Sequence, residues 1–240
     1  MRVWPIFGLL ALMSCAAEAQ DDAQDTDMSI GEQLEAQELS NAYLPFARYA
    51  LNEAAKRARG GTVSSAVLVP KVSLIDPSTI ACDTKPLSVI IDLDVAPGTP
   101  AEMEIEPQSG FSFLLTFLRG SGIRIAWLAE TSEARLKPIT DLLREGDEPV
   151  MRDEDLILIG LPGSASKQDR RSQLARDYCV VAIAGDRKGD FDELYDYLRD
   201  QSYAIRLEAY TDRGWFLLPH PVAAIDSERL AISPEQKAEQ

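Results

Sequence analysis

The feature of this sequence that most constrains its fold is a regular alternation of short apolar runs with amphipathic segments, which begins at residue 87. Four runs rich in Val, Ile and Leu are expected to be strands: 87–91, 123–128, 156–159 and 179–184. The amphipathic segments that follow them are expected to be helices: 111–119, 132–144, 167–177 and 191–201. Strands without polar alternation are buried on both faces, so the pattern predicts a doubly wound parallel α/β sheet.

The segment before the sheet is expected to be helical over residues 30–59. Its apolar residues recur at steps of three and four, Pro45 interrupts the pattern, and Gly60 and Gly61 close it. Residues 62–84 are expected to be irregular connections. Because no break in composition follows residue 85, we expect one α/β domain over residues 31–225, with an N-terminal helical segment and a flexible tail at 226–240.

Residues 1–19 resemble a signal peptide. An apolar run over residues 3–13 follows Arg2, and Ala17-Glu18-Ala19 has the small-x-small pattern of a cleavage site. Cys15 ends a Leu-Met-Ser-Cys sequence that also resembles a bacterial lipobox, so lipid modification of this cysteine is the alternative. Residues 20–30 are acidic and polar, which is typical of a disordered tether. Both alternatives predict a periplasmic or secreted protein, or an outer-membrane lipoprotein held by its lipid anchor alone.

The net charge of -15 at pH 7 limits the partners that this chain can bind. So acidic a surface repels nucleic acid phosphates and anionic lipid head groups, which disfavours nucleic acid as a partner. No segment approaches the roughly 18 consecutive apolar residues that a membrane span needs. The sequence carries no signal for the oligomeric state.

Acidic residues follow two of the expected strands. Asp92 and Asp94 come after the first strand, and Asp186 and Asp190 come after the fourth. Ligands of open parallel sheets bind beyond the carboxyl ends of the strands, where these acids would converge and repel one another unless a cation neutralised them. Hard oxygen ligands suit Mg²⁺, and Lys167, at the start of the helix before the fourth strand, is placed to meet an anion. Together these residues predict a phosphate-handling site.

Four segments in order resemble the haloacid dehalogenase superfamily, most closely its subfamily IIIB of secreted and lipoprotein acid phosphatases. Ile-Asp-Leu-Asp at 91–94 resembles the first motif, and Ser-Lys-Gln-Asp-Arg-Arg at 166–171 resembles the third. Gly-Asp-Arg-Lys-Gly-Asp-Phe at 185–191 resembles the fourth motif, Gly-Asp-Asn-x-x-Asp-Phe. The segment Leu-Pro-His-Pro at 218–221 resembles a tail that usually reads Leu-Pro-Asn-Pro.

The resemblance implies a role for each acidic residue and for the lysine. Asp92 would be the nucleophile that forms an aspartyl-phosphate, and Asp94 would protonate the leaving oxygen and then activate water. Asp92, the Asp94 backbone carbonyl and Asp186 would hold Mg²⁺, with Asp190 in support. Lys167 would bridge Asp92 and the phosphoryl group. A small-molecule phosphate monoester is the implied substrate.

The sequence also departs from the family pattern at residues 96, 129 and 220. Ala96 and Ala129 stand where the first and second motifs carry hydroxyl residues, and His220 replaces the usual Asn. Thr131 or Thr99 could supply a hydroxyl instead. Loss of one such donor typically costs about 2.7–4 kcal/mol of transition-state stabilisation. Two interpretations stay open: an exported Mg²⁺-dependent phosphomonoesterase of reduced activity, or a catalytically impaired relative that acts as a binding or scaffold module.

Cys82 and Cys179 precede the strands that end in Asp92 and in Asp186. In the fold that the resemblance implies, these strands are parallel neighbours, which puts both cysteines at the edge of the sheet opposite the site. The resemblance therefore favours a disulfide, and the alternative is a pair of buried free thiols.

Overall fold

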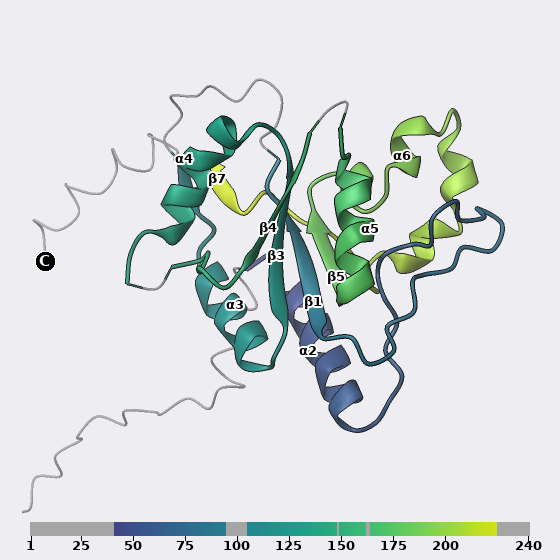
Figure 1. Cartoon of the computed structure of the whole chain (residues 1–240), viewed down its shortest axis with the longest axis horizontal. Coiled ribbons are helices and arrows are strands. Elements are labelled where there is room, and N and C mark those ends of the chain that lie inside the picture. The colour runs from purple at the N-terminus through teal and green to yellow at the C-terminus, as the bar shows by residue number, and fades with distance from the viewer. Residues whose placement is uncertain (1–40, 95–104, 148, 162–163, 225–240) are drawn as a thin grey trace, which may run out of the picture.

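A five-stranded, fully parallel sheet forms the centre of the molecule, as Figure 1 shows. The computed structural model describes residues 41–94, 105–147, 149–161 and 164–224. The strand order is β4-β3-β1-β5-β6. The strands are β1 (Leu87–Asp92), β3 (Arg124–Glu130), β4 (Leu156–Gly160), β5 (Cys179–Gly185) and β6 (Trp215–Leu217). The doubly wound α/β fold is confirmed, and β6 adds an edge strand that the sequence pattern had not indicated.

Strand β1 lies between β3 and β5, and all six of its residues are buried. From β1 the chain adds β3 and β4 on one side, then returns to place β5 and β6 on the other. This reversal creates a switch point at the carboxyl ends of β1 and β5, where ligands of such sheets bind. Asp92, the last residue of β1, therefore lies at the position where a ligand is expected.

Helices cover both faces of the sheet. Residues of α2 (Leu44–Ala58), α3 (Phe111–Gly120) and α4 (Glu133–Arg144) pack in one core with Val89 and Ile91 of β1. Residues of α5 (Lys167–Asp177) pack in a second core with Ile90, on the opposite face. Successive residues of β1 thus point into different cores, as the period of two of a strand requires.

The expected helix over residues 191–201 is wrong. The chain instead forms short elements: η1 (Lys188–Asp190), α6 (Leu194–Tyr197), η2 (Gln201–Ala204) and η3 (Leu207–Tyr210). Asp192 and Asp200 cause the breaks, because their carboxylates accept hydrogen bonds from the backbone N–H groups of Leu194 and Ser202, two residues later. Such local bonds compete with a continuous helix.

The helix expected over residues 30–59 begins at Leu44, and residues 30–40 lie outside the described ones. Pro45 occupies the first turn of α2 rather than its interior, where the missing N–H does no harm. A small antiparallel pair of β2 (Ile105–Pro107) and β7 (Val222–Ala224), also not indicated by the sequence, joins segments far apart in the chain.

Cys82 and Cys179 form a disulfide, with their Cα atoms 4.7 Å apart. Cys179 is the first residue of β5 and pairs in register with Leu87, the first residue of β1. The bond therefore lies at the end of the sheet opposite Asp92, which decides between the two alternatives in favour of the disulfide. Within the described residues, no helix combines the length and the apolar character needed to cross a membrane. The expected signal peptide, tether and tail (1–19, 20–30 and 226–240) lie outside the described part of the chain.

Candidate active site

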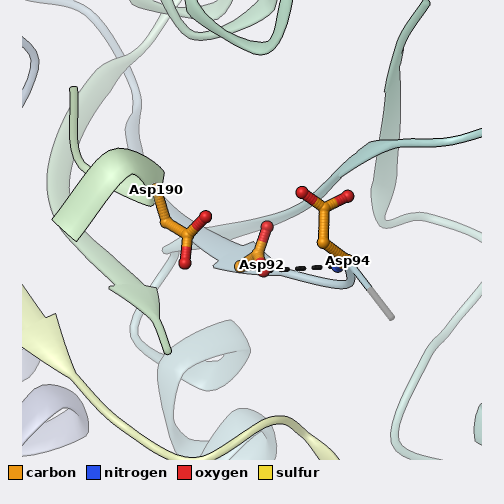
Figure 2. A group of neighbouring side chains, drawn as sticks. All are labelled: Asp92, Asp94 and Asp190. Atoms are coloured by element: carbon orange, nitrogen blue, oxygen red, sulfur yellow. Dashed lines mark hydrogen bonds between the residues drawn. The ribbon is translucent and has the colours of Figure 1, made fainter. Parts of the chain in front are cut away.

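Asp92 and Asp94 occupy the end of β1 and the turn that follows it. Asp92 is buried, with 3% of its side chain exposed. The backbone N–H of Asp94 donates to Oδ2 of Asp92 at 3.2 Å, and the backbone N–H of Glu130 donates to Oδ1 of Asp94 at 2.5 Å. These bonds hold both carboxylates at the carboxyl edge of the sheet (Figure 2).

Lys167 reaches this edge from the first residue of α5. Ser166 and Asp169 form a capping box, in which each side chain accepts a hydrogen bond from the backbone N–H of the other residue. Gly160 allows the close approach of this helix start, because a Cβ atom there would lie 3.0 Å from the backbone nitrogen of Lys167. The sequence thus fixes the start of the helix and the direction from which the lysine enters the site.

The ammonium group of Lys167 forms ion pairs with three carboxylates. It contacts Asp92, lies 2.6 Å from Oδ2 of Asp94, and lies 2.8 Å from Oδ1 of Asp190. Burial by itself lowers the pKa of Lys167, but the three negative charges outweigh this effect and raise it to about 12. The lysine is therefore a permanent cation at the centre of the site.

Asp190 is fixed from several directions. Its Oδ2 accepts the backbone N–H of Arg187 at 2.8 Å, and its backbone carbonyl accepts Nη1 of the buried Arg171 at 2.7 Å. Gly185 lies directly beneath it, since a Cβ atom at Gly185 would come within 2.5 Å of the Asp190 Cβ. The glycine of the fourth motif is thus the space into which the Asp190 side chain fits.

Three of the predicted site carboxylates converge. Oxygen atoms of Asp92, Asp94 and Asp190 lie within 4.8 Å of one another, and Figure 2 shows their side chains turned toward a common space. Burial raises the pKa of Asp92, Lys167 lowers it, and the charges of Asp190 and Asp94 raise it again, so that together these effects bring it to about 7. The negative charge in excess of the lysine and the set of hard oxygen donors both fit a divalent cation such as Mg²⁺.

Asp186 lies outside this three-carboxylate group. Its side chain is 31% exposed and faces the guanidinium of Arg187, with Oδ1 3.6 Å from Nε. Burial and the neighbouring charge of Asp190 raise the pKa of Asp186. The structure thus brings together Asp92, Asp94, Asp190 and Lys167, and sets Asp186 beside them.

Two further residues interact with the charges of the site, although the motifs had not singled them out. Arg187 stands where the fourth motif has Asn, and its Nη2 lies 3.3 Å from Asp94 and 3.4 Å from Asp190. Tyr43, before α2, is buried, and its burial, followed by the charges of Asp92 and Asp186, raises its pKa; its hydroxyl donates to the Pro219 carbonyl at 2.5 Å. The replacement of Asn by Arg in the fourth motif is a signal in the sequence that points to Arg187, whereas no motif points to Tyr43.

A pocket of about 150 Å³ opens over the carboxylates. Its lining comes from the ends of β1 and β3, the start of α5 and the loop after β5: Asp94, Glu130, Ser166, Lys167, Gln168, Arg171, Arg187, Gly189, Asp190, Glu193, Asp196 and Tyr197. Glu130, the last residue of β3, is among these lining residues. The lining therefore combines cations with carboxylates, and the buried Asp92 lies behind Asp94 and Lys167 rather than in the lining itself.

Ala129 and His220, two of the residues that depart from the family pattern, lie in the described part of the chain, and neither lines the pocket. Ala129 is buried in the core, so its methyl group offers the site nothing, and Thr131 does not line the pocket. Ala96 and Thr99 lie outside the described residues. His220 does not line the pocket either, and its Nδ1 accepts the backbone N–H of Val222 at 3.2 Å.

Comparison with known proteins identifies the fold. No protein-family model and no curated protein matches the sequence. The solved structure of a class C acid phosphatase from Bacillus anthracis aligns with a TM-score of 0.50 and 17% identity over 80% of each chain. A class C acid phosphatase from the same organism with tungstate bound aligns with a TM-score of 0.39 and 17% identity, over 57% of this chain and 68% of that one. The first of these alignments shows that the described part of the chain shares the α/β fold of the class C acid phosphatase.

Proposed function

We propose that this chain is a Mg²⁺-dependent phosphomonoesterase of acid phosphatase type, related to subfamily IIIB, that acts through an aspartyl-phosphate on Asp92. One observation carries the proposal: three carboxylates from two strand ends converge on the buried ammonium of Lys167 at the switch point of the sheet. A nucleophile, a proton donor and a fixed cation at one point are the groups that phosphoryl transfer from a monoester requires.

In the first step, an oxygen of Asp92 attacks phosphorus and the bond from phosphorus to the alcohol oxygen breaks. Asp94 gives its proton to the departing alcohol. In the second step, Asp94 takes a proton from water, the water oxygen attacks phosphorus, and the bond to Asp92 breaks to release inorganic phosphate. Asp94 lies two residues from the nucleophile and is held by Glu130 and Lys167, so it can serve both transfers without moving far.

Asp92, Asp94 and Asp190, with Asp186 beside them, are the residues that would hold Mg²⁺, which would neutralise charge on the phosphoryl oxygens. Lys167 keeps Asp92 and Asp190 in place and supplies fixed positive charge next to the attacking oxygen. Alanines replace the hydroxyl donors expected at residues 96 and 129. We therefore expect kcat to be lower, by about two to three orders of magnitude for each missing donor, than in an enzyme that has both hydroxyls.

We further propose that the protein works outside the cytoplasm. The Cys82–Cys179 disulfide supports this, because such bonds persist in oxidising compartments and are rare in the cytosol. The net charge of -15 favours a small phosphate monoester over a nucleic acid as substrate.

Hydrolysis of p-nitrophenyl phosphate with Mg²⁺ tests the proposal. We expect Asp92→Asn to lower kcat on the order of a thousandfold or more, because no covalent intermediate can form. Asp141→Asn is the matched control, since Asp141 forms an exposed ion pair with Lys137 far from the motifs. Equal rates of hydrolysis for the wild type and Asp92→Asn would refute the proposal that this protein is a phosphatase. Magnesium-dependent trapping of beryllofluoride in the wild type alone would identify Asp92 as the phosphoryl acceptor.

A further inference from the structure

We propose that Arg187 binds the phosphoryl group of the substrate, in place of the hydroxyl donors that this chain lacks. The inference rests on the proposed function, since it assigns a substrate contact in the same pocket. It concerns a residue in which this chain departs from the family pattern: an arginine stands where the fourth motif has Asn.

The ammonium group of Lys167 has no N–H donor left for a ligand. An ammonium group has three N–H donors. In this structure the ammonium of Lys167 meets three separate carboxylates, those of Asp92, Asp94 and Asp190. Because these three carboxylates engage all of its donors, Lys167 can attract a phosphate by its charge but has no free N–H group to donate to it.

Arg171, the other buried cation of the pocket, is also held by hydrogen bonds to the protein. Arg171 is 1% exposed, and it donates from Nη1 to the Asp190 carbonyl and from Nε and Nη2 to Oε1 of Gln168. These contacts fix the loop after β5. Arg171 therefore acts as a structural support and cannot turn toward a ligand without releasing Asp190.

Arg187 differs from both cations. Its side chain is 58% exposed and lines the pocket, and its guanidinium approaches the carboxylates only at 3.3 Å, 3.4 Å and 3.6 Å through Nη2 and Nε. Within the described residues, its Nη1 has no partner. Contacts this long are weak, and exposed ion pairs contribute little, so the guanidinium can exchange them for a stronger ligand.

The backbone of Arg187 is nevertheless fixed. Its N–H donates to Oδ2 of Asp190 at 2.8 Å, two residues after the end of β5 at Gly185. A planar guanidinium that starts from a fixed backbone and carries free N–H groups matches the oxygens of a phosphoryl group bidentately. It would supply the two donors that Ala129 and the alanine at position 96 do not.

The test compares Arg187→Gln, Arg187→Lys and Lys188→Gln with the wild type in the presence of Mg²⁺. Lys188→Gln is the matched control, because it removes one positive charge from the same loop but lies outside the pocket lining and pairs with Glu208. The readouts are the dissociation constant of inorganic phosphate by calorimetry, KM and kcat for p-nitrophenyl phosphate, and the dissociation constant of Mg²⁺.

We expect Arg187→Gln to raise the dissociation constant of phosphate and KM by about tenfold or more, through the loss of a charge-assisted pair of bonds. Arg187→Lys should recover part of this loss, and Lys188→Gln should change either constant by less than about threefold. Circular dichroism and an unchanged Mg²⁺ constant would show that the site is intact.

Phosphate binding separates this inference from the proposed function. If the wild type binds phosphate without turning over substrate, and Arg187→Gln abolishes binding, Arg187 stands as an anion ligand while the phosphatase proposal fails. If Arg187→Gln binds phosphate as tightly as the wild type, or if the wild type does not bind phosphate, the assignment of Arg187 is overturned. A change in Mg²⁺ affinity alone would overturn it too, because Arg187 would then serve only as a counter-ion of the carboxylates.

Discussion

The ammonium of Lys167 lies 2.8 Å from the carboxylate of Asp190, and this pair joins the start of α5 to the loop after β5. Both side chains are buried, with 8% and 2% of their surface exposed. The pair therefore does two jobs at once. It compensates the negative charge that β1 and β5 bring together, and it ties two separate elements to one point.

Replacing Lys167 by Met should destabilise the metal-free protein. Removal of one partner from a buried ion pair leaves uncompensated charge and costs about 3–5 kcal/mol. Urea unfolding in EDTA measures the change, and added Mg²⁺ should restore part of it. Lys137→Met, which breaks an exposed pair with Asp141, is the control and should change the free energy of unfolding by less than about 1 kcal/mol. Equal losses in both variants would contradict the role given to Lys167.

Replacing Gly185 by Ala should displace Asp190. The added methyl group would lie 2.5 Å from the Asp190 Cβ, closer than two such atoms can approach, so the carboxylate must move away from Asp92. We expect weaker Mg²⁺ binding, by about tenfold or more, in a titration followed by calorimetry. Gly120→Ala is the control, since a Cβ atom there meets nothing within 4 Å. Mg²⁺ binding that is equal in the two variants would argue against the close fit at Gly185.

The pKa of Asp92 predicts how pH acts on stability in the absence of metal. Burial raises the folded-state pKa to about 7, above the unfolded value of about 3.9, so the folded protein holds the extra proton between these values. The free energy of unfolding should fall as pH rises through this window. Asp92→Asn removes this dependence, and its gain in melting temperature over the wild type should be larger at pH 8 than at pH 5.

Thermal unfolding in EDTA at the two pH values measures this difference. Asp141→Asn, at an exposed position, should show no such trend. A gain from Asp92→Asn that is the same at both pH values would mean that Asp92 is already ionised in the folded protein at pH 5.

Removing the disulfide should lower stability without changing the site. The Cys82–Cys179 bond spans 97 residues, and in the chain-entropy account a loop of this length contributes about 4–5 kcal/mol. Chemical unfolding of the Cys82→Ala, Cys179→Ala double variant measures the loss. Its Mg²⁺ dissociation constant should match that of the wild type, because the bond lies at the opposite end of the sheet. A reductant should destabilise the wild type and leave the double variant unaffected.

The elements that the sequence predicted well are those with a strong local signal. The start of α5 follows from the capping residue Ser166, and the buried strands follow from uninterrupted runs of Val, Ile and Leu. Asp92 and Asp94 could be placed at the sheet edge because the end of a buried strand determines where the next side chains lie.

The rest depended on contacts between distant segments or within turns. Strands β2 and β7 are three residues each and lie more than a hundred residues apart, so neither has a periodic pattern of its own. The local bonds of Asp192 and Asp200 broke a helix that the apolar periodicity favoured. The direction of the Arg187 side chain depends on its turn toward Asp94, which lies 93 residues earlier.

The disulfide between Cys82 and Cys179 also affects the register in which β1 and β5 pair. Cys82 lies five residues before β1 and Cys179 begins β5, so the bond ties the chain just ahead of one strand to the first residue of the other and opposes a slip of the strands by one residue. A slip of that size would turn every side chain of a strand to the opposite face. Because the bond keeps the amino ends of the two strands together, it favours the register that places Asp92 beside the carboxyl end of β5.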